Sequence, residues 1–420
     1  MRVFASTSQI AEHLDLLASL PSVEGEGFTE IDHGLQTAAI LARTHPDDEA
    51  LQIAGLLHDL AHPWDGPGQP RHAPMGADAV RPLLGDRVAE LISAHVPAKR
   101  YLVATEPEYV ARLSADSVMT LAAQGGPMDP SEVADFERDP DHRAMVALRR
   151  ADEEAKIPGA VVPTLDHWLP MLDRVVAAEH FEQSGWVLVD VLDEAGTTQL
   201  RSWADDVVDS GDATGVLHYR EMTDHGPRLC RSENFVPSHP GLRELLTRGA
   251  MPAMASALLR TPAVLYKEKI NYKLAGGAGY APHQDAPAYP FVDTHASCML
   301  AIDDSLVHNG CLEVVDAMHR EILPTDDVGC IRPDIAAALD WQPMEVRAGQ
   351  ALWFHSRTPH RSGPNRSRHD RRALYPTYNA LREGNLRDAY YAEKLQRMAA
   401  EQVGDNVQVS LIGDFQGRPV

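Results

Sequence analysis

The spacing of apolar residues changes near residue 180. From about residue 8 to residue 178, apolar side chains recur every three or four positions, which predicts amphipathic helices. Helical segments with this spacing are expected at 35–42, 50–60, 87–95, 110–123 and 142–156. Breakers separate them at Pro46, 66–70, Pro97 and 125–127. This half is therefore predicted to be an α-helical bundle.

Beyond about residue 180 the spacing becomes that of β-strands. Short runs rich in β-branched and aromatic residues lie between Gly, Pro and Asp turns, and we expect them to be strands. These runs are 185–192, 263–273, 296–302, 310–315, 345–354 and 373–379. Helical segments are expected at 194–210 and 241–259. The pattern predicts a β-sandwich or barrel preceded by helices.

The length of the chain supports the same division. Its 420 residues, 44% of them hydrophobic, are too many for one ordinary core and fit two domains of about 150–250 residues each. The change of pattern places the boundary between about 172 and 180. Domains are therefore expected at 1–178 and 179–420, without internal repeats or low-complexity segments.

The charge of the chain limits its partners. A net charge of −23 argues against nucleic acid and anionic membranes, because both attract basic surfaces. An anionic small molecule would need a local cluster of cations or metal ions in order to bind. There is no run of 18 apolar residues, and the N-terminal sequence carries charges where a signal peptide needs an apolar run. The four cysteines lack CxxC spacing, and we expect reduced thiols in a cytoplasmic protein.

His58 and Asp59 are adjacent in the segment LLHDLAH. A carboxylate can bridge two ions and an imidazole can bind one of them, so the pair suits a metal cluster if the helix end is held close to the ions. The pair also has a simpler interpretation, in which the histidine caps carbonyls at a helix end and the aspartate faces water.

Further candidate ligands stand on successive predicted helices. Each alone could be an ordinary core or surface residue. The set is His33, His72, His95 and Asp152. With His58 and Asp59 they offer six nitrogen and oxygen ligands, enough for two hard or borderline metal ions and too many for one structural zinc.

The order of these ligands, H…HD…H…H…D, resembles that of the HD-domain superfamily. The segments HVPAKRYL, LSADSVMTLAAQGGP and ADEEAK make residues 25–156 more similar to the mixed-valence diiron oxygenases that cleave carbon–phosphorus bonds (the PhnZ type). This resemblance implies that two iron ions are bound by His33, His58, Asp59, His72, His95 and Asp152.

The same resemblance implies contacts to a substrate. They fall on Glu26, His62, Lys99, Ser117 and Thr120. Lys99 offers a point charge for a phosphonate, the two hydroxyls are donors, His62 can supply a proton and Glu26 could hold a cationic amine. Without the resemblance, Lys99 would be a solvated cation at a helix end and the hydroxyls would bond to their own helix.

The C-terminal half contains a second set of ligands. His283 and Asp285 form an HxD pair, and on a strand residues i and i+2 point to the same side, so both can bind one ion. His360, in TPHRSGPN, offers a third ligand. Two histidines and one carboxylate leave three positions open, which non-heme Fe(II) oxygenases use for 2-oxoglutarate and O2. Arg371 follows as a bidentate cation for the cosubstrate carboxylate.

The segments GGAGYAPHQD, NGCLEVVDAMH and HRSGPNRS, with the arginine after them, resemble the phytanoyl-CoA dioxygenase superfamily over residues 181–398. The resemblance implies a double-stranded β-helix (jelly-roll) in which His283, Asp285 and His360 bind Fe(II) and Arg371 binds 2-oxoglutarate. Weaker cosubstrate candidates are Lys273 and Asn271, and the runners-up for the distal ligand and the clamp are His355 and Arg372. The segment LYPTYNALREGNLRDAYYAEK is closer to the phosphonate α-hydroxylases (the PhnY type).

Together the resemblances imply a bifunctional fusion that degrades an organophosphonate. Hydroxylation of the carbon next to phosphorus, dependent on Fe(II) and 2-oxoglutarate, would be followed by O2-dependent cleavage of the carbon–phosphorus bond to phosphate and a carboxylic acid. A 2-aminoethylphosphonate-like substrate is expected. Val23 stands where the diiron family often has a tyrosine three residues before the glutamate, so either the gating ligand is absent or the substrate end differs.

Two other interpretations of the first half remain open. One is an HD phosphohydrolase of a phosphate ester or nucleotide, fused to an unrelated small-molecule hydroxylase. The other is a non-catalytic HD module that binds a ligand or controls assembly. The KRYL and QGG segments argue against the first, and six intact ligand positions argue against the second.

Overall fold

The computed structural model describes residues 3–22, 27–64, 71–113, 115–210, 215–223, 226–289, 292, 295–327 and 329–400. The chain divides into two compact units, residues 1–179 (unit 1) and 180–420 (unit 2). The division falls near the end of α8 (Leu165–Ser184).

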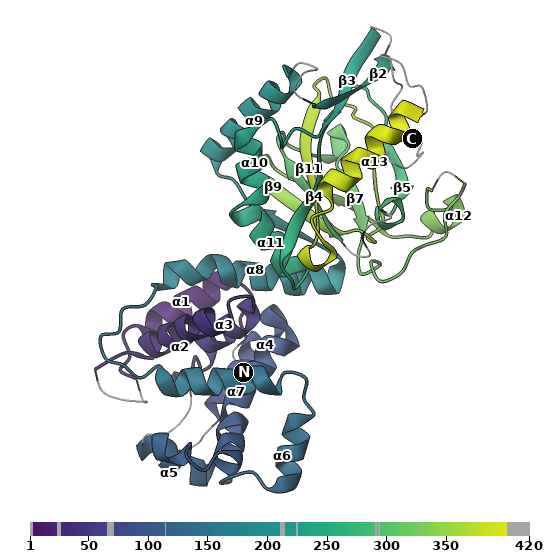
Figure 1. Cartoon of the computed structure of the whole chain (residues 1–420). Helices are drawn as coiled ribbons and strands as arrows, with labels where there is room; N and C mark the ends of the chain where they lie inside the picture. Colours follow the sequence, from purple (N-terminus) through teal and green to yellow (C-terminus); the bar gives the residue numbers. More distant parts are fainter. Residues whose placement is uncertain are drawn as a thin grey trace. The chain divides into compact units, whose positions relative to one another are not determined.

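Unit 1 is helical, as the sequence predicts (Figure 1). Its other helices are α1 (Thr7–Leu17), α2 (Glu30–Thr44), α3 (Glu49–Leu57), α4 (His72–Thr105), α5 (Ala115–Ala123), α6 (Pro130–Glu137) and α7 (His142–Glu154), with 3-10 turns at His62–Trp64 and Val110–Arg112. Helices α2, α3, α4 and α7 pack against one another. One apolar core, which includes Leu57, Ile92 and Trp168, joins them.

Local capping fixes where the ligand-bearing helices begin. Thr29 and Asp32 form a reciprocal capping box at the start of α2, so His33 lies in its first turn. The side chain of Asp48 accepts from the backbone N–H of Leu51 and starts α3, which ends directly before His58. Two short-range sequence signals therefore determine where these two helices begin.

Some of the predicted boundaries are wrong. Pro97 does not interrupt α4, because a proline removes only one backbone donor and the flanking turns can hold the helix together. The break lies instead at Gly85, whose φ of 79° is outside the helical range. Segment 110–123 divides into a 3-10 turn and α5, and segment 241–259 divides at Gly249 (φ 71°). The breaks at Pro46 and 125–127 are confirmed, while 66–70 lies outside the described residues.

Unit 2 contains two antiparallel sheets, which confirms the predicted jelly-roll class. The seven-stranded sheet has the order β1-β9-β6-β11-β4-β3-β2, and the four-stranded sheet has the order β5-β10-β7-β8. The strands are β1 (Trp186–Asp190), β2 (Leu217–Thr223), β3 (Gly226–Glu233), β4 (Ala263–Lys273), β5 (Tyr280–His283), β6 (His295–Ala301), β7 (Leu312–Val315), β8 (Trp341–Met344), β9 (Gln350–His355), β10 (His360–Ser362) and β11 (Arg371–Ala380). Non-consecutive neighbours in both sheets indicate the crossovers of a double-stranded β-helix.

The core of unit 2 lies between the sheets. Met299 on β6 and Phe354 on β9 come from the larger sheet, and Val314 on β7 comes from the smaller one. The flanking helices are α9 (Glu194–Val208), α10 (Pro240–Thr247), α11 (Ala250–Leu258), α12 (Pro333–Ala336) and α13 (Arg387–Ala400). Helices α10, α11 and α13 contact β4 (Figure 1). Strands β2, β3, β5, β8 and β10 were not predicted. In β5, β8 and β10, three or four residues are too few for an alternating pattern to show, whereas the equally short β7 lies within the longer run at 310–315.

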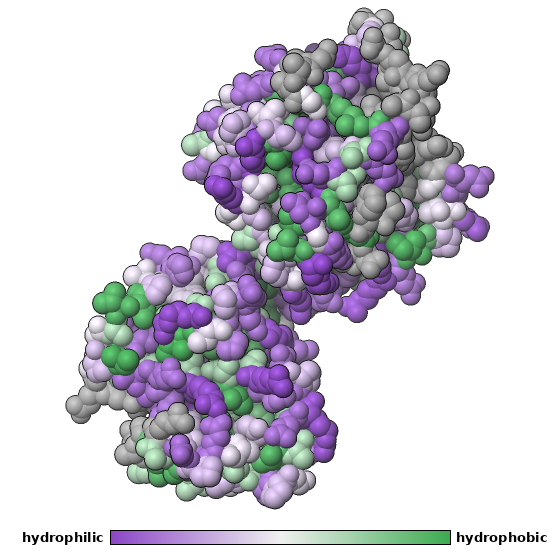
Figure 2. Space-filling model, viewed as in Figure 1, coloured by the Kyte–Doolittle hydropathy of each residue, from purple (hydrophilic) through white to green (hydrophobic). Residues whose placement is uncertain are grey.

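The surface that Figure 2 shows is mostly hydrophilic, with apolar side chains scattered over it. Among the described residues, every helix is too short or too polar to span a lipid bilayer. All four cysteines are buried and none forms a disulfide, as the sequence predicts.

Replacing Gly34 by Ala tests the packing that holds the ligands of unit 1. A Cβ at Gly34 would lie 2.5 Å from the backbone oxygen of Leu56, so α2 would have to move away from the end of α3. We expect Gly34→Ala to lower the free energy of unfolding by about 1–3 kcal/mol. Gly76→Ala is the matched control, because its Cβ would meet nothing closer than 3.6 Å and alanine favours a helix. Calorimetry of the full chain measures both, and equal stabilities would contradict the packing argument.

Candidate metal centres

The structure brings the six candidate ligands of unit 1 together. They come from α2, from the residues directly after α3, from both parts of the kinked α4 and from α7, and they are His33, His58, Asp59, His72, His95 and Asp152. Five of them are buried and His72 is nearly so. A cluster of this kind from four helices is the arrangement that the sequence spacing predicts.

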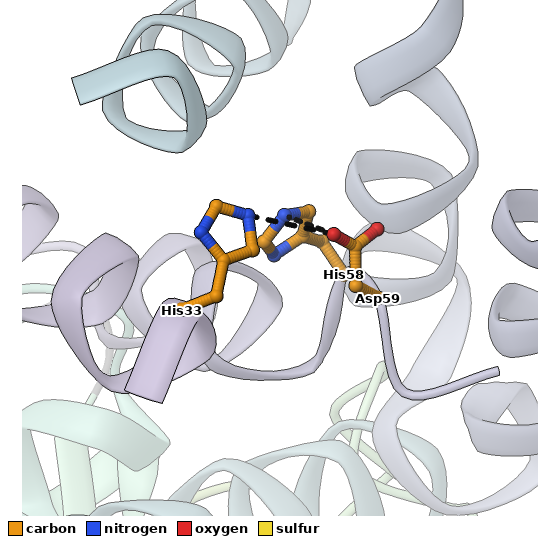
Figure 3. Close-up of side chains that lie close together, drawn as sticks. All are labelled: His33, His58 and Asp59. Carbon is orange, nitrogen blue, oxygen red and sulfur yellow. Dashed lines mark ion pairs between the residues drawn. The ribbon is translucent and has the colours of Figure 1, made fainter. Parts of the chain in front are cut away.

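The Oδ2 atom of Asp59 faces the first group of ligands. It lies 3.5 Å from His33 Nε2 and 3.1 Å from His58 Nε2 (Figure 3). Asp152 Oδ1 completes the group, 3.3 Å from His33 Nε2 and 3.9 Å from His58 Nε2. Two ligands that bind one ion at about 2.1 Å are themselves separated by about 3.0–3.4 Å. The group therefore has the size of a metal site.

The Oδ1 atom of Asp59 faces a second group. It lies 3.5 Å from His72 Nε2 and 3.6 Å from His95 Nε2, and these two nitrogens are 3.1 Å apart. Each carboxylate oxygen of Asp59 is thus directed at a different set of imidazoles. The arrangement suits a carboxylate that bridges two ions.

Backbone carbonyls orient the imidazoles. The Nδ1–H groups of His33, His58 and His95 donate to Ala155 O (3.0 Å), Gly55 O (2.8 Å) and Ile92 O (2.7 Å). These hydrogen bonds place Nδ1–H on the backbone and direct Nε2 at the carboxylates. Burial by itself would lower the pKa of His33, but Asp152 and Asp59 outweigh it and hold that pKa well above its ordinary value, so an ion bound at His33 Nε2 would displace a proton. Within the described chain, the Nε2 atoms of His33 and His58 are buried and have no hydrogen-bond partner. Buried imidazole nitrogens left in this way fit metal ligands.

The electrostatics keep the oxygen ligands ionised. Burial by itself would raise the pKa of the Asp59 carboxyl, but His58 and His62 outweigh it and hold that pKa well below its ordinary value. Burial holds the pKa of His95 well below its ordinary value, so this imidazole is neutral. Metal ligands need these protonation states. Arg149, which is buried and donates to both Asp152 and Tyr109, fixes the other oxygen of Asp152.

His62 belongs to the same cluster. Its Nε2 lies 3.5 Å from Asp59 Oδ1, and its Nδ1 is 3.0 Å from Oε2 of the buried Glu30. The geometry suits either a further ligand or a residue that carries a proton beside the ions. The sequence analysis did not find Glu30, although its position three residues before His33, in the same first turn of α2, would have placed it near the cluster.

The other predicted substrate contacts of unit 1 are only partly described. Lys99 on α4 is buried and its Nζ donates to Thr120 Oγ1 on α5 at 3.0 Å. Ser117 lies on α5, where the structure does not describe its side chain. Glu26 and Val23 lie outside the described residues. The structure therefore brings together one pair, Lys99 and Thr120.

Unit 2 contains a separate group of three ligands. His283 on β5 is opposite His360 on β10, and the Nε2 atom of each lies 3.9 Å from Asp285 Oδ1. Their Nδ1–H groups donate to the carbonyls of Ala281 (2.8 Å) and Thr358 (3.0 Å), two residues before each histidine. Ser297 on β6 donates to Asp285 Oδ2 at 2.9 Å. All three ligands are thus held with one donor atom directed at a common point.

The protonation of this group also fits a metal ion. Burial lowers the pKa of His283 to about 3, so its imidazole is neutral. Burial would raise the pKa of Asp285, but His360, His283 and Lys269 outweigh it and hold that pKa below its ordinary value. The protonation of His283 and Asp285 therefore fits the donor set of a mononuclear non-heme iron site, which is two histidines and one carboxylate.

The three ligands of unit 2 line a pocket of about 530 Å³, part of it open to solvent. Polar and aromatic side chains make up most of the remaining wall. They include Arg231, Lys269, Asn271, Tyr280, Tyr289, Ser297, Tyr375 and Thr377. Of these, only Asn271 was among the site residues predicted from the sequence.

The predicted cosubstrate residues lie along β4 and β11. Arg371 is opposite Lys273 and donates to Gly310 O at 3.1 Å. Lys273 Nζ donates to Gly310 O (3.1 Å), Ser362 Oγ (2.9 Å) and the carbonyl of Gly363, and burial lowers its pKa to about 7. Asn271 Oδ1 accepts from Arg231 Nε at 3.1 Å and faces the pocket.

The two runners-up have other partners. The Nε atom of Arg372 lies 2.9 Å from Asp303, and its NH1 lies 2.7 Å from Asp205. His355 Nδ1 accepts from the backbone N–H of Arg357 at 3.0 Å, and this histidine is not part of the three-ligand group.

Comparison with known proteins agrees with this division. The HD domain family matches residues 31–123, and the phytanoyl-CoA dioxygenase (PhyH) family matches residues 181–373. The methylphosphonate hydroxylase of Gimesia maris is 44% identical over 246 residues, which are 57% of this chain and 95% of that protein.

The chain belongs to both families. Unit 1 contains the HD domain and unit 2 the PhyH domain, so the protein is an oxidoreductase of the dioxygenase type. A 1-hydroxy-2-(trimethylamino)ethylphosphonate dioxygenase (glycine-betaine-forming) of Leisingera caerulea is 37% identical over 160 residues, 36% of this chain and 81% of that protein. The hydroxymethylphosphonate dioxygenase of Gimesia maris is 35% identical over 158 residues, 34% of this chain and 75% of that protein.

The HD match ends at residue 123, before Asp152. The structure nevertheless places Asp152 Oδ1 3.3 Å from His33 Nε2. The last ligand position of the motif is therefore filled in space as well as in sequence order.

Metal analysis of the full chain tests the two centres. After anaerobic loading with Fe(II), we expect three ions per wild-type chain. Asp59→Asn should retain about one, because the neutral amide removes the negative charge that both imidazole sets share. Asp285→Ala should retain about two. Mass spectrometry of the metal content measures each number. A wild-type chain that binds a single ion would contradict the assignment of unit 1.

Proposed function

We propose that the chain degrades an organophosphonate by two successive oxidations. Unit 2 hydroxylates the carbon bonded to phosphorus, using 2-oxoglutarate and O2 and giving a 1-hydroxyphosphonate, succinate and CO2. Unit 1 then consumes a second O2 and cleaves the carbon–phosphorus bond, giving phosphate, a carboxylate and one proton. The observation that carries the proposal is that one chain holds both a six-residue ligand cluster, in which the two oxygens of Asp59 face different imidazoles, and a separate group of two histidines and one aspartate.

The named relatives support this sequence of reactions. One is a methylphosphonate hydroxylase and another is a hydroxymethylphosphonate dioxygenase, both of Gimesia maris, and the hydroxylated product of the first is the substrate named for the second. The alignment with the hydroxylase covers 57% of this chain, about 239 residues, which is more than the 179 residues of unit 1 and fits within unit 2. The alignment with the dioxygenase covers 158 residues, which unit 1 could contain. We therefore assign hydroxylation to unit 2 and cleavage to unit 1, with a boundary near residue 178.

In unit 2, His283, Asp285 and His360 would hold Fe(II), which with 2-oxoglutarate supplies the activation of O2. The carbonyl hydrogen bonds to both imidazoles and the Ser297 hydroxyl on Asp285 keep the ligands in place during turnover. Arg371 and Lys273 together would bind the distal carboxylate of 2-oxoglutarate, since they are a cross-strand pair of buried cations. Asn271 would donate to the cosubstrate from the same strand.

In unit 1, the six ligands would hold two iron ions, which supply the redox chemistry with O2. Lys99 and Thr120, whose Nζ and Oγ1 atoms are 3.0 Å apart, would bind phosphonate oxygens as a cation and a hydroxyl donor. Ser117, on the same helix as Thr120, is proposed as a further donor. Glu30 keeps a proton on Nδ1 of His62, so Nε2 is the atom that would accept the proton of the substrate hydroxyl. These residues orient the substrate and move a proton.

The substrate needs a hydrogen-bearing carbon next to phosphorus. The substrates named for the relatives differ in their nitrogen content. Methylphosphonate has no nitrogen, whereas 1-hydroxy-2-(trimethylamino)ethylphosphonate has a trimethylated amine. We propose a 2-aminoethylphosphonate-like compound, with Glu26 as the contact to its amine. A panel of methylphosphonate, 2-aminoethylphosphonate and its N-methylated forms, followed by 31P NMR under air, identifies which is consumed.

Two substitutions separate the reactions. Asp285→Ala should reduce phosphate release from the parent phosphonate at least about 100-fold and leave release from the 1-hydroxy compound unchanged, because only the site of unit 2 is removed. Asp59→Ala should do the reverse and cause the 1-hydroxyphosphonate to accumulate. 31P NMR distinguishes parent, intermediate and phosphate in one spectrum.

The same assay tests the rival phosphohydrolase. A hydrolytic HD domain would release phosphate from esters as fast under argon as under air, whereas the proposed reactions stop without O2. If Asp285→Ala also abolished release from the 1-hydroxy compound, the division of the reactions between the units would be wrong.

A further inference from the structure

The pocket of unit 2 contains more cations than its ligands and cosubstrate require. Lys267, Lys269, Asn271 and Lys273 alternate along β4, so their side chains lie on one face of the strand. This face is directed into the unit, because Lys269 and Asn271 line the pocket that contains the three metal ligands. The alternation KxKxNxK is visible in the sequence, although the sequence analysis used only its last two members.

Lys269 differs from the two lysines on either side of it. Lys273 is held by three oxygen acceptors, and Lys267 Nζ contacts the Tyr289 hydroxyl. Within the described chain, Lys269 forms no hydrogen bond or ion pair, and its nearest aromatic contact is the Tyr375 ring, 5.5 Å from Nζ. Burial and the cations Arg231 and Lys267 hold its pKa well below the ordinary value. The ammonium form of Lys269 therefore lacks the anionic partner that would stabilise it.

Arg231 enters the pocket from the neighbouring strand. It lies on β3 opposite Asn271, it is 3% exposed, and it lines the same cavity as Lys269. Its Nε donates to Asn271, and its NH1 is 3.5 Å from Glu233 Oε1. The Glu233 carboxylate is shared with Lys394, whose Nζ is 2.6 Å away. The single negative charge of Glu233 is therefore divided between Arg231 and Lys394, and it does not fully neutralise Arg231.

The charges around Lys269 leave a positive surplus. The charged groups that act on Lys269 or on Glu233 from β3, β4, α13 and the segment after β5 include Arg231, Lys267, Lys394, Glu233 and Asp285. Arg361, which also lines the pocket, is paired with Glu313. With Lys269 in its ammonium form, four cations stand against two carboxylates, a surplus of two positive charges before any metal ion is added. The chain as a whole carries −23, so this pocket is a local exception of the kind that a dianionic ligand needs.

We propose that Lys269 and Arg231 bind the phosphonate dianion of the substrate in unit 2. The assignment rests on the function proposed above and adds the residues that hold the phosphorus end. The pair Arg371 and Lys273 lies at the far end of β4, and Lys269 is four residues from Lys273, about 13 Å along the strand. The phosphonate and 2-oxoglutarate would thus bind to separate pairs of cations. The pair Lys269 and Arg231 lines the same pocket as the three metal-ligand residues.

This separation determines which bond is oxidised. A phosphonate fixed by Lys269 and Arg231 presents the carbon attached to phosphorus to the metal ligands, whatever the length of the chain beyond it. Selectivity for the carbon next to phosphorus would then depend on the dianion and not on the rest of the substrate.

The test uses methylphosphonate with the full chain carrying Asp59→Asn, so that the hydroxylated product accumulates. We expect Lys269→Met and Arg231→Gln each to raise the KM for methylphosphonate about 10- to 100-fold, which corresponds to the loss of one charge-assisted hydrogen bond. The KM for 2-oxoglutarate should change less than about 3-fold. Calorimetric titration of the Fe(II)- and 2-oxoglutarate-loaded chain with methylphosphonate under argon should show the same loss of affinity. Every chain in this titration also carries Lys99→Met, which removes the phosphonate contact proposed for unit 1, so that the measured binding reports on unit 2.

Two control variants make the result specific. Lys269→Arg keeps the charge and should restore the KM to within about 5-fold of the parent chain. Arg228→Gln removes a charge from the same strand outside the pocket, where Arg228 pairs with Asp370, and should leave both KM values unchanged. Metal content equal to that of the parent chain shows that the variants are folded.

The outcomes distinguish this assignment from the proposed function. A rise in the KM for 2-oxoglutarate without a rise for methylphosphonate would mean that Lys269 and Arg231 bind the cosubstrate, and would overturn the assignment. Unchanged KM values for both would overturn it while leaving the function intact. If the parent chain neither binds nor hydroxylates any phosphonate, both proposals are overturned.

Discussion

The carboxylate of Asp59 is the constraint on which the arrangement of unit 1 depends. An ionised carboxylate buried in a helical core costs several kcal/mol unless positive charge or hydrogen-bond donors surround it. Here each oxygen faces a different set of imidazoles, and two of the nitrogens that face Oδ2 have no other partner. Ions between these groups would satisfy both the carboxylate and the nitrogens. The packing of α2, α3, α4 and α7 has to meet this requirement, because α2, α4, α7 and the residues directly after α3 supply ligands that lie within a few ångströms of one another.

Both units orient their imidazoles by one device, although their scaffolds differ. In the helices, Nδ1 of His58 and His95 donates to a carbonyl three residues earlier in the chain. In the strands, Nδ1 of His283 and His360 donates to a carbonyl two residues earlier. The local backbone fixes the tautomer in each case, so the free nitrogen is set before any ion arrives. A ligand set prepared in this way loses little conformational entropy on binding.

Much of the fold and of the metal centres could be predicted from the sequence. The helical and strand periods separated the two halves, and strand 263–273 was predicted to the residue as β4. The break at Gly85 was missed. The sequence alone does not show that α4 would break at this glycine and continue through Pro97. Short strands such as β10 carry too few residues for a pattern. They become strands because both neighbours supply hydrogen bonds.

The pocket of unit 2 was harder to predict than the ligands that it contains. Metal ligands have characteristic spacing in the sequence, whereas Arg231 meets Lys269 and Asn271 only through the pairing of β3 with β4. Residues brought together by strand register leave no local signal. Glu30 lies between these two situations. Its position in the first turn of α2 places it near His33, but its contact with His62 can be inferred only when the position of the turn at His62–Trp64 is known.

The central claim is that Asp59 bridges two iron ions, and anomalous diffraction at the iron edge measures this directly. Crystals of the iron-loaded chain should show two peaks about 3.5–4 Å apart, one on each side of the Asp59 carboxylate, and a third peak among His283, Asp285 and His360. A single peak in unit 1, or none beside Asp59, would contradict the account.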